Sequence, residues 1–453
     1  MELDLVIIGA GSAGEYAASH AAGGGRRVGL VEKDRVGGDC VFRACIPTKA
    51  LVHAARLHKG MRNAGFFGLP ESDAMPDYSR VKAFKDRIVG GIGGGRAESM
   101  SRRGVRVLEG EAEFVSPHEI LIGEERVRAE RFIVATGSDP SVPPVPGLEE
   151  AGYITNIEAL ELEKVPGRLA VIGGGPVGVE FAQIFSAFGA RIHIFEMADR
   201  IVGGEDEEIS AALEELLLKQ GVALSTGVKV SGVEAGGGVK TVTAESGSGE
   251  RRTAEFDEIL VATGRRPAVD ALNLQAAGLE TGDSGIEVDS TLRTSVPHIW
   301  AAGDVTGPPY YTYTGNEEGR IAALNAITGG EREMRYDVLP RSTFCDPEIG
   351  SVGFTEAQAV EHGFEVETGR FDYADMTRPI VSGETDGFIK IVADRDTGHI
   401  IGGHILGSEA STMIHEIALA VSAGLTAAGV GGMLHSYPTF SEGIGYACQK
   451  VGK

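Results

Sequence analysis

The sequence is poor in cysteine, has no excess of basic residues and contains no long apolar run. Its 42 basic residues face 65 acidic ones, a net charge of −23, which leaves no electrostatic footprint for nucleic acid or an anionic membrane. No segment approaches the ~20 apolar residues of a membrane-spanning helix. Residues 2–8 run directly into an expected strand, with no room for a signal peptide. We therefore expect a cytoplasmic protein without a nucleic-acid or membrane partner.

Only four cysteines occur, and Cys40 and Cys45 are separated by four residues just before an expected helix that includes residues 50–57. Unpaired N–H groups at a helix start stabilise a thiolate, so this position suits a reactive thiol pair. Cys345 and Cys448 are isolated and no second Cys/His pair has ligand spacing, so we predict no metal site. Two buried core cysteines are the other interpretation. A reducing compartment fits a cysteine pair that is oxidised and reduced during catalysis better than a disulfide that stabilises the fold.

With 453 residues and 42% apolar content, the chain is long enough for about three globular domains. The first begins with an apolar strand at residues 5–8, a turn with the spacing Gly-x-Gly-x-x-Gly and an expected helix. A second strand ends at Glu32, where an acid would take a ribose hydroxyl pair. Glycines there let the backbone approach a pyrophosphate, although a tight turn in another α/β protein gives the same pattern. The glycines are Gly9, Gly11 and Gly14.

The same unit occurs a second time, which argues against a chance turn. A strand at residues 169–172 leads into glycines, and a strand at 192–195 ends at Glu196. The acid follows the first glycine by 23 residues in both units, 32 − 9 and 196 − 173. Each unit also has a later strand that ends in Val-Ala-Thr-Gly. We expect two nucleotide sites, and the residues of the repeat are Gly173, Gly175, Gly178, Thr136, Gly137, Thr263 and Gly264.

Between and after these units the pattern is mixed. Residues 78–103 look helical but carry five glycines, residues 105–132 alternate as short strands, and residues 205–219 form an amphipathic helix with acids in its first turns. An apolar strand then ends at Asp304, either a cofactor ligand at a sheet edge or a helix cap. From residue 336 onward strands and helices alternate without a glycine fingerprint, which predicts a third domain.

Together these features resemble the FAD-dependent pyridine nucleotide-disulfide oxidoreductases. The resemblance covers essentially the whole chain and implies an α/β fold, with two Rossmann-like FAD- and NAD(P)-binding domains and a C-terminal α+β dimerisation domain. It also implies an obligate homodimer in which the C-terminal segment of one subunit completes the disulfide site of the other. The implied domains are 1–145 with 265–335 for FAD, 146–264 for NAD, and 336–453 for the dimer interface.

The resemblance also implies roles for individual residues. Glu196, without an arginine cluster after it, suits the free 2′-hydroxyl of NAD better than the 2′-phosphate of NADP. Lys49 and Glu180 match the family's ion pair beside the flavin. The implied FAD residues are Gly9, Gly11, Gly14, Glu32, Thr136, Gly137 and Asp304, and the implied nicotinamide nucleotide residues are Gly173, Gly175, Gly178, Glu196 and Gly264.

The implied chemistry couples NAD(H), FAD and the Cys40–Cys45 disulfide to a small disulfide or a lipoyl-carrying substrate, as in dihydrolipoamide dehydrogenase. Cys45 would lie next to the flavin, and Cys40 would exchange with the substrate through a mixed disulfide. A different class is a non-catalytic flavoprotein used as an interaction module. The intact cysteine pair and Lys49 argue against it, because a scaffold has no need for a thiolate beside a flavin.

One departure from the family pattern concerns the substrate. The residue before Pro-Thr near the C-terminus is histidine in the disulfide reductases, oriented by a glutamate, whereas here it is Tyr437 with Glu442 present. A phenol of pKa ~10 accepts a proton poorly at neutral pH, so either His435 is the base or Tyr437 only donates a hydrogen bond. Tyr437 and Tyr313 resemble mercuric reductase, which makes a mercuric or other metal-ion reductase the alternative. The chain's tail lacks the vicinal cysteines of that enzyme.

Overall fold

The computed structural model of the chain describes residues 1–23, 25–282 and 284–453, and the chain folds into two compact units. Unit 1 consists of Met1–Ala50, Ala83–Ser141 and Gly264–Arg335. Unit 2 consists of Leu51–Lys82, Val142–Thr263 and Tyr336–Lys453. The boundaries of the three domains expected from the sequence stay a prediction.

A seven-stranded, mainly parallel sheet forms the centre of unit 1, in the order β3-β2-β1-β6-β5-β4 with β18 paired to β6. Apolar residues fill both faces because Ile7 belongs to one hydrophobic cluster and its neighbours Val6 and Ile8 to another. The strands of this sheet are β1 (Glu2–Ile8), β2 (Val28–Glu32), β3 (Val105–Glu109), β4 (Ala112–Ser116), β5 (Glu119–Ile122), β6 (Glu125–Val134) and β18 (Ile299–Ala301). Two separate two-stranded sheets pair β7 (Ser138–Pro140) with β15 (Arg265–Pro267) and β16 (Thr281–Gly282) with β17 (Gly285–Ile286).

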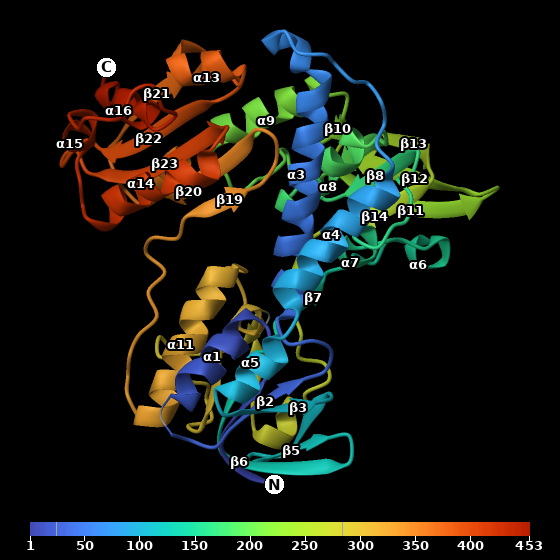
Figure 1. Ribbon diagram of the computed structural model, residues 1–453, viewed down its shortest axis with the longest axis vertical. Coiled ribbons are helices and arrows are strands. Elements are labelled where there is room, and N and C mark those ends of the chain that lie inside the picture. The colour runs from blue at the N-terminus through green and yellow to red at the C-terminus, as the bar shows by residue number, and fades with distance from the viewer. Residues whose placement is uncertain (24, 283) are drawn as a thin grey trace. The chain divides into compact units, whose positions relative to one another are not determined.

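Helices α1 (Ser12–Ala22) and α11 (Thr312–Thr328) lie side by side against this sheet (Figure 1). They approach closely because a Cβ at Gly319 would collide with the Ala13 carbonyl oxygen. The Ala-rich face of α1 therefore packs directly on α11. The other helices that lie wholly or partly in unit 1 are α2 (Gly38–Phe42), α3 (Cys45–Arg62), α4 (Tyr78–Gly93), α5 (Arg96–Arg102), α10 (Leu274–Ala277) and the 3-10 turn η2 (Asp304–Thr306).

The glycine-rich segment expected to be helical is two helices. Helix α4 ends at Gly93, and Gly95, with φ +73°, precedes α5. A Cβ at Gly93 would collide with the ring of Phe42, which lies between the two cysteines of the sequence motif. The glycines therefore make room for the segment that carries the cysteine pair.

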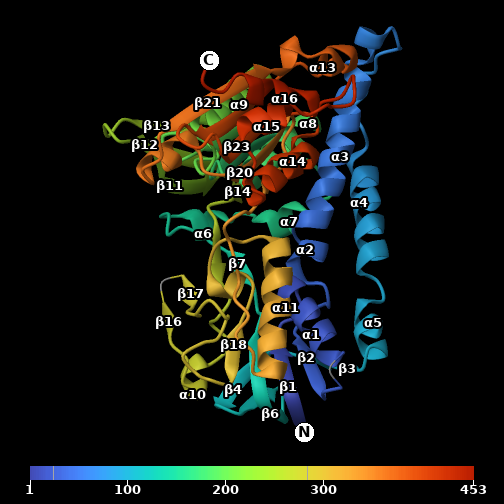
Figure 2. The same cartoon turned by 90° about the vertical axis from the view of Figure 1, so that its left-hand side faces the viewer.

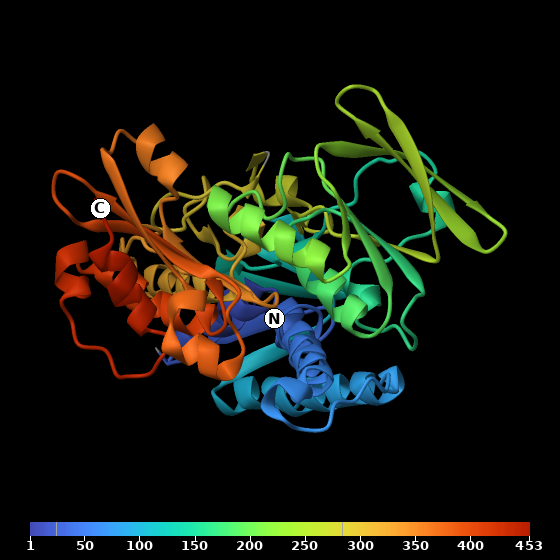
Figure 3. The same ribbon diagram turned by 90° about the horizontal axis from the view of Figure 1, so that it is seen from above.

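Unit 2 contains a parallel sheet of order β10-β9-β8-β14. Pro176 stands at the first turn of α8, where its missing N–H costs nothing, and Asp206 caps α9 by accepting from the Glu208 backbone N–H. A separate antiparallel sheet, β11–β13, appears as yellow-green arrows in Figure 3. The elements are β8 (Arg168–Ile172), α8 (Pro176–Ala187), β9 (Arg191–Phe195), α9 (Glu207–Lys219), β10 (Ala223–Ser225), β11 (Val228–Gly236), β12 (Val239–Ser246), β13 (Arg251–Phe256), β14 (Glu258–Val261), α6 (Leu148–Ala151), α7 (Asn156–Ala159) and η1 (Ala64–Phe67).

The C-terminal part of unit 2 is an antiparallel five-stranded sheet, β19-β20-β23-β22-β21, with helices α14, α15 and α16 grouped beside it in Figure 2. Its core is mainly aliphatic, with many of the side chains coming from β22, β23 and α14. This confirms the expected α+β organisation. The elements are β19 (Arg341–Thr343), β20 (Glu348–Gly353), α12 (Glu356–Glu361), β21 (Val366–Asp372), η3 (Tyr373–Asp375), α13 (Thr377–Ser382), β22 (Phe388–Asp394), β23 (Ile400–Gly407), α14 (Ala410–Ser422), α15 (Ala427–Gly431) and α16 (Glu442–Gln449).

A buried charge cluster lies within unit 2. Lys390 on β22 is 2% exposed, and its ammonium is 3.1 Å from Asp206 and 2.7 Å from both Glu208 and Glu356. Burial opposes the charge on Lys390, but the hydrogen bonds that its ammonium donates to Glu208 and Glu356, together with the charge of Asp206, outweigh burial and raise the lysine pKa. Across the described parts of the chain, no helix is both long and apolar enough to cross a membrane.

Candidate active site

The first glycine turn has the geometry of a phosphate cradle. Gly9 has φ +100°, and a Cβ at Gly14 would collide with the Gly9 carbonyl oxygen, so both positions require glycine. On the side where Gly11 would carry a side chain there is open space, since a Cβ there would meet no atom within 4 Å. The Glu32 carboxylate accepts from the N–H groups of Ala10 and Asp34, both at 2.8 Å. The loop is therefore held in place with its open side toward the N-terminus of α1.

The second glycine turn repeats this geometry within unit 2. Gly173 has φ +108°, and a Cβ at Gly178 would collide with the Gly173 carbonyl oxygen. Gly175 again faces open space. The Glu196 carboxylate accepts from the N–H groups of Gly174 at 2.6 Å and Ala198 at 2.7 Å.

The segment before Cys40 packs on the first glycine turn. The Gly37 N–H donates to the Ala10 carbonyl at 2.8 Å. Gly38 has φ +59°, and a Cβ there would lie 2.6 Å from the Gly11 Cα. The redox candidate is thus built directly onto the candidate cofactor loop, and no larger residue fits at Gly38.

The structure separates the positions of the two cysteines. Cys45 is the first residue of α3, as expected for a thiol at a helix start, but Cys40 lies in the short preceding helix α2. The expected single helix entrance for both residues is therefore wrong for Cys40. The two thiols still meet within hydrogen-bond reach, and Cys45 Sγ lies 3.4 Å from Thr312 Oγ1.

The surroundings of the pair assign the negative charge to Cys45. The hydrogen bond from Cys40 lowers the pKa of Cys45 to about 6 against the effect of burial, with help from Thr312 and the charge of Lys49. The same hydrogen bond and burial raise the pKa of Cys40. Arg96, held by a two-pronged ion pair with the buried Glu15 at 2.6 Å, adds positive charge near Cys40. These contacts favour Cys45 over Cys40 as the thiolate of a reduced pair.

Asp304 lies where the sequence placed it, directly after β18, and it begins the 3-10 turn η2. Its carboxylate accepts from Ser138 Oγ at 2.5 Å, and burial raises its pKa. Thr136 donates to the Ala268 carbonyl at 2.7 Å, and Gly264 accepts from the Ser141 N–H at 2.9 Å. Thr136 and Gly264 thus hold together the segments around β7 and β15, and Gly137, with φ +76°, lies between Thr136 and β7.

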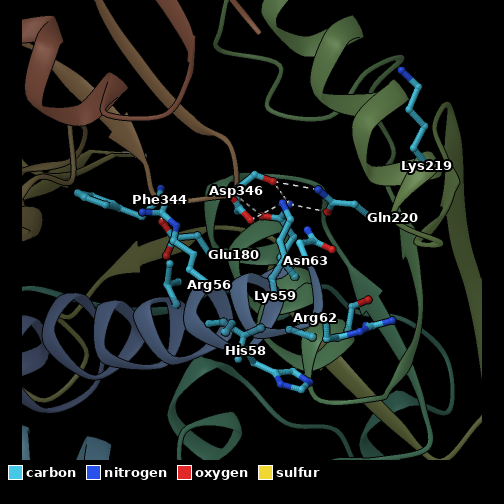
Figure 4. A pocket seen from close by; sticks show the side chains of 16 residues that line it. Arg56, His58, Lys59, Arg62, Asn63, Glu180, Lys219, Gln220, Phe344 and Asp346 are labelled. Carbon is cyan, nitrogen blue, oxygen red and sulfur yellow. Dashed lines mark hydrogen bonds and ion pairs between the residues drawn. The ribbon is translucent and has the colours of Figure 1, made fainter. Parts of the chain in front are cut away.

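Glu180 on α8 is buried and accepts from the Phe344 N–H at 2.9 Å. Glu180 also lines a cavity of about 420 Å³ between α3, α8 and residues 344–346, shown in Figure 4. Two of the charged side chains on its walls form ion pairs: Lys59 is 2.6 Å from Asp346, and Arg56 is 2.7 Å from Glu348. The pairing of Glu180 with Lys49 stays a prediction.

Near the C-terminus the expected partners are arranged differently. Tyr437 is 69% exposed and donates to Thr377 Oγ1 at 3.2 Å. The buried Glu442 accepts from the Thr439 N–H and from the Tyr446 hydroxyl. His435 instead pairs with a glutamate of helix α14, with Nε2 2.8 Å from Glu416 Oε1. The structure thus supplies a His–Glu pair two residues before the position where the family has one.

Sequence reasoning missed Thr312, Arg265 and Glu416. Thr312 and Arg265 reach the site from segments that follow the second glycine unit, and no motif spacing marks them. The sequence gives one weak indication that Thr312 belongs to the site. Thr312 begins a helix that follows the Asp304 turn, and α/β proteins bind ligands at this edge of the sheet. Within the described residues there is no cluster of three or more His, Cys, Asp or Glu side chains suited to a metal ion.

The geometry fits FAD in unit 1. The open side of Gly11, the fixed Glu32 carboxylate and the buried Asp304 at the carboxyl edge of the same sheet match what a dinucleotide needs from a Rossmann-like fold. The second turn offers the same cradle and acid for a nicotinamide nucleotide.

Comparison with known proteins agrees with this geometry. Residues 3–327 match the pyridine nucleotide-disulphide oxidoreductase family, and residues 339–448 match the dimerisation domain of that family. The chain therefore belongs to the pyridine nucleotide-disulphide oxidoreductases, which are FAD-dependent enzymes that use NAD(P)H.

Its relatives have more than one named activity. The chain is 36% identical to a mercuric reductase from Bacillus cereus, over 98% of this chain and 70% of that protein. It is also 36% identical to the dihydrolipoyl dehydrogenase of Bacillus subtilis (strain 168), over 98% and 95%. The HOCl-induced flavoprotein disulfide reductase RclA of Escherichia coli has a similar structure, with a TM-score of 0.89, 29% identity and coverage of 98% and 99%.

Proposed function

We propose that the protein is a cytoplasmic, homodimeric flavoenzyme, similar to dihydrolipoamide dehydrogenase, that transfers electrons between NAD(H) and a disulfide or dithiol through the Cys40–Cys45 pair. The observation that carries this proposal is the thiol pair itself. Cys40 and Thr312 stabilise the thiolate form of Cys45, and the turn just before Cys40 packs against the candidate FAD loop. A packing role alone requires neither the lowered pKa nor this position.

The chain's own residues account for the exchange with substrate. Cys40 loses its proton as its sulfur attacks one sulfur of a substrate disulfide, which forms a mixed disulfide, and the substrate thiolate that is released takes up this proton. The Cys45 thiolate then attacks the Cys40 sulfur, which releases the second thiol and forms the Cys40–Cys45 disulfide. Two electrons and two protons go to the substrate, and dithiol oxidation is the reverse. Bound FAD supplies the route by which an electron pair passes between the nicotinamide and the disulfide.

The nucleotide-binding roles follow from the two glycine turns. In this proposal Gly9, Gly11, Gly14, Glu32, Thr136, Gly137 and Asp304 serve FAD, while Gly173, Gly175, Gly178, Glu196 and Gly264 serve the nicotinamide nucleotide. NAD is preferred because the Glu196 carboxylate, fixed by two backbone N–H groups, suits ribose hydroxyls and repels a 2′-phosphate. Lys49 and Glu180 would form the ion pair beside the flavin.

The C-terminal segment supports a dimer with shared active sites. Leu434 is 97% exposed, and Tyr437 and Val381 are also exposed around the Tyr437–Thr377 bond. Large apolar side chains in such positions suit burial against a second copy of the chain. The hydroxyl of Tyr437 would donate a hydrogen bond to a substrate sulfur or to the thiols of the partner subunit. Glu442 would fix the turn through Thr439, and His435 with Glu416 is the remaining proton acceptor.

A mercuric or other metal-ion reductase that uses the same dithiol is the second candidate. The observation in its favour is Tyr437 at the position of the expected histidine, together with relatives named mercuric reductase. A soft metal ion would be held between two thiolates as substrate. Against it, the residues that follow Cys448 in this sequence include no further cysteine.

The test uses the purified enzyme with NADH under anaerobic conditions. We expect a long-wavelength absorbance band from a thiolate beside the flavin, lost in Cys45→Ser and kept in Cys40→Ser, while Cys40→Ser loses turnover. Normal turnover by Cys40→Ser contradicts the proposal. Substitution of the buried Cys345, whose pKa is raised by burial, is the matched control and leaves both properties unchanged.

Assays with different acceptors separate the two candidates. NADH oxidation is measured in parallel with lipoamide, glutathione disulfide and Hg(II), and NADPH is compared with NADH at each. Turnover with a disulfide supports the first function, whereas turnover with Hg(II) alone supports the second. Faster turnover with NADPH contradicts the role given to Glu196.

A further inference from the structure

Arg265 occupies a distinctive place in unit 1. It begins strand β15, which pairs antiparallel with β7, and Arg265 faces Pro140 in this register. The chain leaves unit 1 after Ser141 and returns to it at Gly264, so β7 and β15 are the two strands beside the crossing points. Arg265 therefore lies next to the point where the chain returns from the segment that carries the second nucleotide turn.

The guanidinium of Arg265 reaches from this junction to the redox turn. Its Nη2 donates to Asp39 Oδ2 at 2.5 Å and to the Ser138 carbonyl at 2.6 Å. Its Nε donates to Ser138 Oγ at 2.6 Å and lies 3.7 Å from Asp304 Oδ2. Asp39 immediately precedes Cys40 in helix α2. The planar guanidinium of Arg265 thus contacts four groups, which are the Asp39 carboxylate, the Ser138 carbonyl, the Ser138 hydroxyl and the Asp304 carboxylate.

Without this cation two carboxylates would face each other. The charge of Asp39 adds to burial in raising the pKa of Asp304, while Ser138 and Arg265 oppose the rise. A second arginine, Arg43, lies 3.7 Å from Asp39 but is shared with Asp34 at 2.5 Å. Arg265 is therefore the cation that sits between Asp39 and Asp304.

We propose that Arg265 is a positioning residue, which holds Asp39 and thereby fixes Cys40 against Cys45. The sequence of contacts is Arg265 to Asp39, then along one peptide to Cys40, and from the Cys40 thiol to Cys45. If Asp39 is released, α2 shifts, the hydrogen bond between the thiols weakens, and Cys45 loses the main group that stabilises its thiolate. The inference deepens the proposed function and rests on it for the use of this dithiol.

The direction in which Asp39→Asn shifts the pKa of Cys45 distinguishes a positioning role for Arg265 from a purely electrostatic effect. Asp39→Asn removes a negative charge near the pair, which by itself would lower a thiol pKa. Positioning makes the opposite prediction, because the neutral amide of this variant no longer binds the guanidinium as an ion pair. Arg265→Lys keeps the positive charge but loses the planar fork, so it also raises the pKa of Cys45 if geometry is what matters.

The experiment measures the pH dependence of iodoacetamide alkylation at Cys45 in the reduced holoenzyme, with the labelled cysteine identified by mass spectrometry. We expect a rise of about one pKa unit for Asp39→Asn and for Arg265→Lys, equal to a tenfold change in the thiolate equilibrium. The double variant changes no further, because both substitutions remove one contact.

The adjacent Arg266 is the matched control, since it forms a surface ion pair with Asp270 at 2.7 Å. Arg266→Lys and Asp270→Asn leave the Cys45 profile in place. An unchanged or lower Cys45 pKa in Asp39→Asn overturns the inference, and so does an equal shift in the Arg266 variants. Alkylation needs no substrate, so this result is independent of whether Cys40→Ser loses turnover, which tests the proposed function.

Discussion

Replacing Thr312 by valine removes one hydrogen bond from the Cys45 sulfur and leaves the packing volume nearly unchanged. The hydroxyl lies 3.4 Å from Sγ, at the first residue of the 17-residue helix α11. The hydrogen bond from Thr312 lowers the pKa of Cys45, and its effect is smaller than that of Cys40. The variant therefore isolates one of the groups that hold the thiolate.

The expected size follows from the strength of such a bond. A hydrogen bond to a charged group is worth about 1.5–3 kcal/mol, and a sulfur acceptor at this distance belongs at the lower end. Since one pKa unit corresponds to 1.36 kcal/mol, the pKa of Cys45 rises by about one unit from about 6. At a pH near 6 the thiolate fraction falls about fivefold, whereas near pH 8 it changes by less than about a tenth.

The assay records Cys45 alkylation rate and ultraviolet thiolate absorbance of the reduced enzyme across this pH range. Thr312→Ser is the control, because it keeps the hydroxyl and should retain the original profile. A Thr312→Val profile that superimposes on the original refutes the hydrogen bond as a cause of the low pKa. A shift of equal size in Thr312→Ser refutes it as well, since packing would then be responsible.

Two further predictions concern cofactor binding and stability. Gly11→Ala fills the open side of the turn, so it should fold but bind less flavin, whereas Gly14→Ala collides with the Gly9 carbonyl and should lower the melting temperature; circular dichroism and the flavin-to-protein absorbance ratio check both. Lys390→Met leaves the buried Asp206 carboxylate without its counter-ion and should lower the free energy of unfolding, measured in guanidinium, by about 3 kcal/mol. Adding Asp206→Asn should restore part of this loss. The pKa of Asp206 is lowered when folded, so its contribution is present above its unfolded pKa and lost as pH falls through the folded value. The pKa of Lys390 is raised, so its contribution is present below its unfolded pKa and lost as pH rises through the folded value.

The nucleotide turns could be predicted from the sequence because their requirements are local. A backbone with φ near +100° at Gly9 and Gly173, and a carbonyl that collides with any Cβ at Gly14, admit glycine only. The acid at the end of the next strand is fixed by the length of one strand-helix-strand unit. Both repeats therefore show the same residues at the same spacing.

The surroundings of the thiols could not be predicted in this way. Thr312 lies 267 positions from Cys45 and Arg265 lies 226 positions from Asp39, and neither contact follows from any local pattern. The placement of Cys40 in a separate short helix depends on the positive φ of Gly37 and Gly38, which is a matter of packing against the first glycine turn. Spacing in the sequence identified the pair but not which thiol carries the charge.

In the C-terminal segment, the contacts that a residue makes indicate its role better than its position in the family motif does. Glu442 is present as in the family pattern, yet its two oxygens bind Thr439 and Tyr446, and so it holds the chain turn rather than an acid–base partner. His435 is paired with Glu416 from a different helix. An enzyme that must accept a proton from a substrate thiol can use this pair, whereas one that only delivers electrons to a disulfide needs no more than the hydroxyl of Tyr437. Glu416→Gln tests this role: it should slow dihydrolipoamide oxidation and, because the same proton is returned in the reverse reaction, lipoamide reduction in proportion, whereas unchanged rates in both directions contradict it.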